Sequence, residues 1–242
     1  MFRRLHHQRI AKILHAFDAD LLQAAECYFG GGTAITLALD EYRESVDIDF
    51  LCASNDGYRI LRNAVSNNLG GLLKTPLKHL REVRTDQYKI YTVLEIEEIP
   101  VKVELIREGR VSIQGALDPA LNVPVLSRLD LYAQKLLANA DRGLDRSAMS
   151  RDIIDLSMMI QSWGDIPKEA WNKACRAYGK QLTQAFQQSV DLISNPAYLA
   201  DCLRKMHMDT RLIATIPATL KTAADRMPVA SDTQKHIDVA AK

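Results

Sequence analysis

The sequence predicts an α+β fold, with a mixed β-sheet and flanking helices followed by an all-helical C-terminal half. Two observations lead to this prediction. Before residue 126, several short segments alternate apolar and polar residues, as half-buried strands do. After Arg128, apolar residues recur at helical spacing, and we find no further alternating segment. We therefore predict an α/β domain over residues 1–126 and a helical domain over residues 127–242.

The composition is that of an ordinary globular protein, with 47% apolar and 25% charged residues in a chain of 242. The formal net charge of +1 argues against strong non-specific nucleic-acid binding by the whole surface, although it allows a local basic patch. No apolar run approaches the roughly 20 residues of a membrane span. The four cysteines form no CxxC pair, which indicates buried free thiols in a reducing compartment. We therefore expect a cytoplasmic protein that does not contact a membrane.

The chain begins with helical spacing of apolar residues from about Leu5 to Glu26. The segment ECYF then predicts a short strand that runs into three consecutive glycines. A helix follows in TAITLALD, where Thr33 is a residue type favoured at an N-cap. The segment VDIDFLC alternates with period two and predicts a second strand.

Farther along, GYRILRNAVSNNLGG indicates a helix closed by its final two glycines. A hairpin follows, with strands at Lys89–Ile96 and Pro100–Ile106 and a tight turn at Glu97–Glu98. The proline-containing segment GALDPALNVPVL is expected to be a connector. Helices are then predicted in the runs LDLYAQKLLANADRG, SRDIIDLSMMIQSW, PKEAWNKACRAYGKQLTQAFQQSVDLI and PAYLADCLRKMHM.

The predicted strand VDIDFLC has two acids on one of its faces. Residues two apart in a strand point to the same side, so Asp47 and Asp49 lie together. The opposite face is apolar and consists of Val46, Ile48 and Phe50. A core strand gains nothing from two acids that repel each other, so their placement indicates a function.

The later segment VKVELI repeats this pattern, with Lys102 and Glu104 on the side away from its apolar residues. If this strand lies beside the first, Glu104 joins Asp47 and Asp49 in a cluster of three carboxylates. Like charges in a partly buried site raise each other's pKa, and a hard divalent cation relieves the repulsion. Mg²⁺ uses a few carboxylates together with substrate phosphate oxygens. The cluster therefore predicts a magnesium site for a phosphate-bearing substrate.

Three consecutive glycines, Gly30–Gly32, precede the second predicted helix. Core packing does not require them, because each glycine costs backbone entropy and buries no side chain. A glycine turn before a helix start presents backbone N–H groups and the positive helix end to a phosphate, at a distance that a Cβ would obstruct. The glycines and the acids together predict a site for a nucleoside triphosphate (NTP) and its metal ion.

Each of these features alone also has a structural explanation. The glycines could form an ordinary strand-to-helix turn, and Asp47 and Asp49 could lie on the solvated face of an edge strand. Glu104 could be a surface acid. Their occurrence together and in this order favours the functional interpretation.

The order of these motifs resembles the DNA polymerase β-like nucleotidyltransferase superfamily, and more narrowly its AbiEii-type family of abortive-infection toxins. That family typically reads GGTxLxL and then RxSxDxDF, which GGTAITLAL and RESVDIDF resemble. Its third motif, a basic residue before an acid on a strand, is matched by Lys102 and Glu104, although many relatives have Asp at the acid position. Asp130 and Lys135 match its fourth motif, an acid five residues before a lysine on a helix. The downstream pattern RDxxDL appears at Arg151–Leu156.

The resemblance implies a nucleotidyltransferase-like fold and a role for each matched residue. Asp47 and Asp49 are expected to hold two Mg²⁺ ions, with Glu104 as a further ligand or as the base. Lys135 is expected either at the departing phosphates or on the surface of its helix. The residues expected to bind the nucleotide are Gly31, Gly32, Thr33, Arg43 and Ser45. The residues expected to support the site are Lys102, Asp130, Arg151, Asp152 and Asp155.

Some of these assignments have structural alternatives. Arg43 and Ser45 could orient Asp47 instead of touching phosphate, and Arg43 could equally be a solvated loop residue. Arg151 and Asp155 stand four residues apart on one predicted helix, where they can pair. This segment could equally form a structural salt bridge to the first half of the chain.

The resulting hypothesis is a metal-dependent nucleotidyltransferase that transfers NMP from an NTP to an RNA acceptor. The resemblance implies the toxin of a toxin–antitoxin or phage-defence system, a tRNA-like acceptor and a cognate antitoxin protein. The basic stretch KTPLKHLREVR is compatible with RNA binding, although such a run is more often a solvated face. Two alternatives stay open. One is transfer to a small molecule, as in aminoglycoside-modifying enzymes, and the other is a non-catalytic module that binds a nucleotide or a partner.

Overall fold

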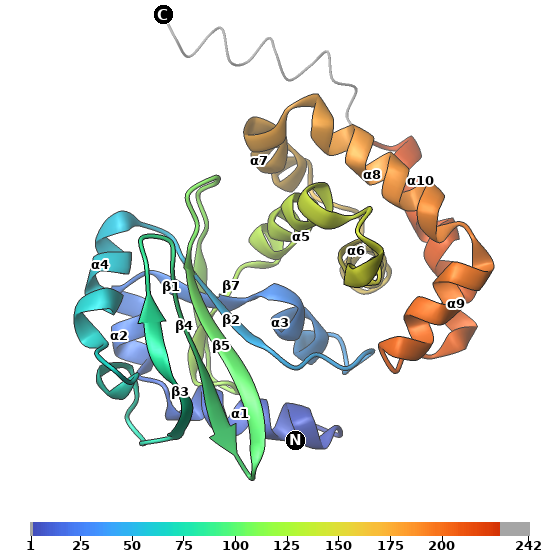
Figure 1. Ribbon diagram of the computed structural model, residues 1–242. Helices are drawn as coiled ribbons and strands as arrows, with labels where there is room; N and C mark the ends of the chain where they lie inside the picture. The colour runs from blue at the N-terminus through green and yellow to red at the C-terminus, as the bar shows by residue number, and fades with distance from the viewer. Residues whose placement is uncertain (1, 228–242) are drawn as a thin grey trace, which may run out of the picture. The chain divides into compact units, whose positions relative to one another are not determined.

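Two units make up the chain in the computed structural model, which describes residues 2–227 (Figure 1). The first unit, Met1–Arg128, contains all the strands of the described chain. The second unit, Leu129–Lys242, is helical in its described part. The predicted mixed sheet with flanking helices and the predicted helical C-terminal half are both confirmed.

One mixed sheet of seven strands forms the centre of the first unit. Its strands are β1 (Cys27–Gly30), β2 (Ile48–Cys52), β3 (Lys78–Thr85), β4 (Lys89–Ile96), β5 (Ile99–Arg107), β6 (Gly115–Asp118) and β7 (Val123–Leu126). They are ordered β3-β4-β5-β2-β1-β7-β6. The pairs β2/β5 and β1/β7 are parallel, and the other neighbours are antiparallel. This order brings β5 directly beside β2, although about 50 residues separate them in the sequence.

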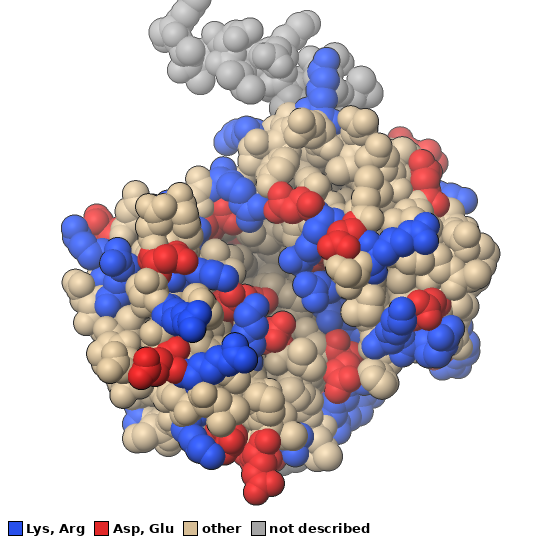
Figure 2. Space-filling model, in the orientation of Figure 1, with Lys and Arg blue, Asp and Glu red and all other residues tan. Residues whose placement is uncertain are grey.

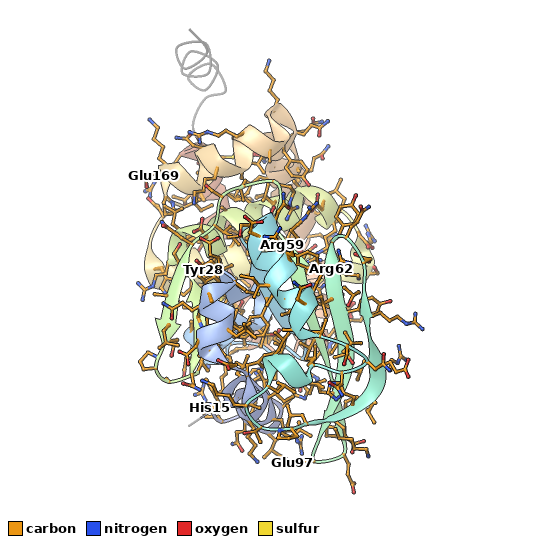
Figure 3. All side chains as sticks on the ribbon, turned by 90° about the vertical axis from the view of Figure 1, so that its left-hand side faces the viewer. His15, Tyr28, Arg59, Arg62, Glu97 and Glu169 are labelled. Carbon is orange, nitrogen blue, oxygen red and sulfur yellow. The ribbon has the colours of Figure 1, made fainter. Side chains whose placement is uncertain are left out.

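Helices cover the sheet of the first unit. They are α1 (Leu5–Ala16), α2 (Ala19–Ala24), α3 (Gly31–Ala38) and α4 (Asn55–Ala64). Figures 1 and 3 show α2 and α4 on the same face of the sheet, and Arg59 and Arg62 of α4 point outward in Figure 3. The core includes Phe50 of β2, whose ring lies 5.0 Å from that of Phe17 and 5.7 Å from that of Phe29. Such aromatic pairs add about 0.5–1.5 kcal/mol each to the free energy that burial provides.

The described part of the second unit consists of helices joined by short turns. They are α5 (Arg128–Arg142, which begins at the boundary), α6 (Arg151–Trp163), α7 (Lys168–Tyr178), α8 (Lys180–Ile193), α9 (Pro196–Lys205) and α10 (Thr215–Asp225). Gly179 separates α7 from α8 with a φ of +58°, a conformation that glycine adopts without strain. Trp171 of α7 and Phe186 of α8 then pack edge to face at 5.3 Å. No helix within residues 2–227 has the length and apolar character needed to cross a bilayer.

Several local predictions are confirmed. β4 has the predicted bounds, and β5 extends the predicted strand by one residue at each end. The turn between them uses positive φ angles, +50° at Glu97 and +63° at Glu98, which match the twist of a two-residue hairpin. Figure 3 shows Glu97 at the tip of this hairpin. The cysteines are free, as expected, and all except Cys175 are buried.

The predicted N-terminal helix and the predicted helix after β2 are both too long. The first is interrupted where Phe17 forms a bridge to Leu73 and the Asp18 side chain caps α2. The second, α4, ends at Ala64, before the glycines that were expected to close it. Helical spacing continued through both interruptions, so the pattern alone did not reveal them.

Three strands were not predicted. β3 lies at one edge of the sheet in the basic stretch, and most of its residues are exposed. The segment expected to be a connector forms the hairpin of β6 and β7 at the other edge. β3 lacks an apolar face, and β6 and β7 have only four residues each, so the alternation that marks β4 and β5 is weak in them.

The N-terminal helix is joined to the loop that leads into β2 by two buried side chains. Glu41 accepts hydrogen bonds from the backbone N–H groups of Arg3 (2.6 Å) and Arg4 (3.0 Å), just before α1 begins. His7 Nδ1 lies 2.8 Å from Glu41 Oε1, and His7 Nε2 accepts the backbone N–H of Ser45 at 3.2 Å. This pattern requires a neutral His7 ring with its proton on Nδ1.

The titration of these two groups follows from their surroundings. Burial lowers the pKa of His7 from 6.5, and this outweighs the opposing effect of Glu41. For Glu41, burial by itself would raise the pKa, but the N–H groups of Arg3 and Arg4 together with His7 lower it from 4.5. The unfolded chain therefore binds the His7 proton first as the pH falls below about 6.5, and the folded state loses stability there.

We predict that His7→Phe lowers the free energy of unfolding at neutral pH by about 1–3 kcal/mol, because it removes the partner of the buried Glu41 carboxylate and of the Ser45 N–H. When the pH is lowered from about 7.5 to about 5.5, the variant should also lose less stability than the wild type. It lacks the His7 ring, whose pKa is lower in the folded state than in the unfolded chain. Urea unfolding at both pH values measures this.

The matched control is His15→Phe, on the same helix but exposed. This variant should keep the pH dependence of the wild type. Equal pH dependence in the wild type and His7→Phe would contradict the predicted role of His7.

Candidate active site

Two of the three predicted acids lie side by side on the sheet. β2 and β5 are parallel, and Asp49 is in register with Glu104. Paired residues of adjacent strands point to the same side, so both carboxylates lie on one face. The neighbours Ile48, Phe50 and Val103 are fully buried on the other face. The two acids therefore share a face, as the alternation predicted.

Asp47 precedes β2 by one residue, two positions before Asp49. The chain is not yet in the sheet here, and Val46, which was expected to face the core, has 47% of its surface exposed. That part of the prediction was wrong, because the alternation of a strand applies only to residues that belong to it.

The glycine turn lies directly against Asp49. Gly30 at the end of β1 pairs with Asp49, and Gly31 follows with a φ of +67° as α3 begins. A Cβ on Gly31 would lie 2.7 Å from Asp49 Oδ2. Only glycine fits this position, both for its backbone conformation and for its approach to the carboxylate. The N-terminus of α3, including Gly32, therefore starts beside the acid pair.

Thr33 is the third residue of α3 and not its N-cap, so the prediction for this residue was wrong. It is almost fully buried. Its Oγ1 donates to the backbone carbonyl of Asp47 at 2.5 Å and lies 2.8 Å from Ser45 Oγ, which must then be the donor of that pair. Thr33 and Ser45 thus position the residue Asp47.

Arg43 is not the solvated loop residue that one interpretation allowed. It has only 4% of its surface exposed, and its guanidinium donates to the carbonyl of Glu44 at 2.9 Å. The guanidinium also lies over the ring of Tyr42, with 5.8 Å between Arg43 Cζ and the ring centroid. Arg43 therefore belongs to the buried support of the loop before Asp47.

Two lysines bind the third acid. Glu104 pairs with Lys89 at 3.0 Å and with Lys102 at 2.5 Å. Burial would raise the pKa of Glu104, but the two lysines outweigh it and lower the pKa from 4.5. Burial would likewise lower the pKa of Lys102, yet the hydrogen bond and charge of Glu104, together with Asp47 and Asp49, raise it. The lysines thus partly neutralise the acidic face.

A magnesium ion was expected between the three acids. Within residues 2–227, no three His, Cys, Asp or Glu side chains are grouped so that they could hold a metal ion. Glu104 contacts lysines instead. Asp47 and Asp49 beside the glycine turn still offer the one or two carboxylates that Mg²⁺ uses together with substrate phosphates, so their chemistry fits this ion.

The fourth-motif lysine lies in the second unit, where carboxylates surround it. Lys135 Nζ of α5 lies 2.9 Å from Asp152 Oδ1 and 2.6 Å from Asp155 Oδ2 of α6. Arg142 binds Asp152 as well, at 2.7 and 3.0 Å. Burial opposes ionisation of Asp152, but Lys135 and Arg142 hold its pKa well below its usual range. Lys135 is 4% exposed, so it is not on the surface of its helix, as one of the two interpretations expected.

The remaining motif residues of the second unit differ in their roles. Asp130 of α5 is fully buried and pairs with Lys173 of α7 at 2.5 Å. The expected pair of Arg151 with Asp155 is absent among the described residues, because Asp155 binds Lys135. Asp130 and Asp155 thus join helices within this unit.

Three residues near the acids were not singled out by the sequence. His7 and Glu41 hold the loop before Asp47, and Lys89 binds Glu104. The predicted hairpin turn was enough to place Lys89. When Ile96 pairs with Ile99, Tyr91 lies opposite Glu104, and Lys89, two residues before Tyr91, lies on the same face of the sheet. No local signal marks His7 or Glu41.

Solved structures share this fold. One is a candidate nucleotidyltransferase from H. pylori, with a TM-score of 0.52 and 13% identity over 92% of this chain and 95% of that chain. Another is JHP933 from Helicobacter pylori, with a TM-score of 0.52 and 12% identity over 100% of both chains. At such identities the likeness shows the fold alone, and it confirms the predicted nucleotidyltransferase-like fold. No curated protein matches the chain in sequence.

The family comparison covers most of the chain. The model of the nucleotidyl transferase AbiEii toxin family, of type IV toxin–antitoxin systems, matches residues 12–233. This range includes the glycine turn, all three acids and the buried lysine cluster of the second unit. The chain belongs to the AbiEii family of nucleotidyltransferase toxins.

Proposed function

We propose that this protein transfers a nucleoside monophosphate from an NTP to a hydroxyl of a tRNA-like RNA in a magnesium-dependent reaction. The observation that carries the proposal is the contact between the Gly31 turn and Asp49, with Glu104 in register on the adjacent strand. The backbone that would bind phosphate and the acidic side chains thus meet at one point of the sheet.

The triphosphate would bind at the start of α3. The backbone N–H groups of Gly31 and Gly32 and the positive end of the helix favour negative charge there. Asp47 and Asp49 would hold Mg²⁺, which when bound neutralises phosphate charge and stabilises the attacking and leaving oxygens. Thr33 and Ser45 fix the backbone at Asp47, so this carboxylate is held in place before substrate arrives.

In the chemical step, an acceptor hydroxyl oxygen forms a bond to the α-phosphorus of the NTP. The bond between the α-phosphorus and the bridging oxygen breaks, and pyrophosphate leaves with that electron pair. The hydroxyl proton passes to Glu104, which the neighbouring lysines keep ionised. The chain thus contributes mainly positioning and charge stabilisation.

The RNA acceptor is supported by charge on the edge strand β3. Arg81 is exposed there, and its side chain forms no ion pair within the described residues. On the face of the first unit that Figure 2 shows, Lys and Arg alternate with Asp and Glu instead of forming one basic patch. This mixed surface favours a local contact with RNA over non-specific binding. Membership of a type IV toxin–antitoxin family also implies a cognate antitoxin.

We predict that Asp49→Asn abolishes both the labelling of RNA by NTP in Mg²⁺ and growth arrest on expression. The amide cannot supply the negative charge that holds the metal ion. Incubation with each labelled NTP and total RNA, followed by electrophoresis, measures the transfer, and parallel reactions with aminoglycosides test a small-molecule acceptor.

Asp56→Asn is the matched control for Asp49→Asn, because Asp56 is an exposed acid on α4. It should behave like the wild type. An Asp49→Asn variant that remained equally toxic would exclude metal-dependent transfer as the cause of toxicity.

Gly31→Ala should reduce transfer roughly 100-fold, because its Cβ would displace the Asp49 carboxylate. The strained backbone should also cost about 1–2 kcal/mol of stability. Gly109→Ala is the control, since a Cβ there meets nothing within 4 Å. Transfer kinetics and thermal unfolding measure both effects, and full activity of Gly31→Ala would refute the contact.

Lys135→Met should destabilise the protein by about 3–5 kcal/mol, because it leaves the buried acids Asp152 and Asp155 without their shared cation. Lys221→Met, an exposed lysine on α10, should cost little. Chemical unfolding measures the difference. A Lys135→Met variant with unchanged stability and a large loss of kcat would instead place Lys135 at the phosphates.

A further inference from the structure

A cavity of about 360 Å³ lies beside Asp47 in the first unit. Part of its wall is apolar and includes Val46 and Leu80, which are 47% and 44% exposed. Its polar groups are Asp47, Arg81 and Lys102. Two exposed apolar side chains thus meet at the same hollow as an acid of the proposed site, and neither is needed there by the core.

The strand order separates this cavity from the glycine turn. β1, which leads into Gly31, lies on one flank of β2, and β5, β4 and β3 lie on the other. The residues that line the cavity belong to those three strands and to the segment just before β2. Phosphates at Gly31 and a ligand in the cavity would therefore lie on opposite flanks of β2, the strand that carries Asp49.

In nucleotidyl transfer, the attacking and leaving oxygens lie roughly in line with the α-phosphorus. A pyrophosphate that leaves at the glycine turn requires the hydroxyl to approach from the opposite flank. The cavity opens on that flank, so it is placed for the acceptor and not for the triphosphate.

We propose that this cavity binds the terminal nucleotide of the acceptor RNA, with the base on Val46 and Leu80 and the preceding phosphate at Arg81. The proposal rests on the nucleotidyl transfer proposed above. Its volume is in the range of pockets that hold small ligands, and apolar walls with a few polar groups are typical of them. The Arg81 guanidinium, which has no ion pair within the described residues, supplies the charge for a phosphate. The terminal ribose hydroxyl would then lie toward Asp47.

The test uses the full chain and short oligoribonucleotides that end in each of the four nucleotides. Fluorescence anisotropy measures their binding without NTP, and transfer kinetics give KM for the RNA and for the NTP separately. The variants are Leu80→Ser and Arg81→Gln. Leu117→Ser, an apolar residue of β6 that is 47% exposed, and Arg84→Gln, on the same strand as Arg81, are the matched controls. Thermal unfolding confirms that all variants are folded.

Both cavity variants should weaken RNA binding and raise KM for the RNA by roughly ten-fold, with KM for the NTP and both controls unchanged. A change in KM for the NTP instead would assign the cavity to the incoming nucleotide and overturn the proposal. Equal loss in Arg84→Gln would show diffuse attraction of RNA and also overturn it, as would RNA binding that neither cavity variant weakens. If the wild type bound RNA through the cavity but transferred no nucleotide, the proposed function would fail while the binding site stood.

Discussion

The register between β1, β2 and β5 is the constraint on which the proposed site depends. Gly30 is opposite Asp49, and Asp49 is opposite Glu104, so the turn and two acids meet without any contribution from flexible loops. Apolar residues on the other face, such as Phe50 and Val103, hold this register by their burial, at about 1.5–3 kcal/mol for each side chain. A slip of one residue would turn every acid toward the core.

Charge balance on the acidic face is a second constraint. A buried Glu104 next to Asp49 is unfavourable unless positive charge is near, and Lys89 and Lys102 provide it. A bound metal would supply positive charge to the same face. In the proposed reaction the lysines hold Glu104 ionised, and a metal ion at Asp47 and Asp49 would add the positive charge that these two acids need.

Two kinds of motif residue must be distinguished in this family member. Gly31 and Asp49 are matched by the family pattern and lie where substrate could bind. Lys135 and Asp155 are matched by it too, yet they form a buried ion pair that joins α5 to α6. Breaking such a pair leaves an uncompensated charge, so these residues are under strong constraint from folding itself. A shared motif thus does not by itself assign a residue to chemistry.

The sequence by itself determined the elements that alternate strongly. The hairpin of β4 and β5, the shared face of Asp49 and Glu104, and the glycine turn follow from local patterns, because strand period and turn conformation are properties of neighbouring residues. The tertiary structure alone decided the edge strands, the partners of Glu104, the His7–Glu41 link and the burial of Lys135. Each of these depends on contacts between residues far apart in the chain, such as His7 and Glu41. Local periodicity carries no information about such contacts, because it does not say which surfaces meet.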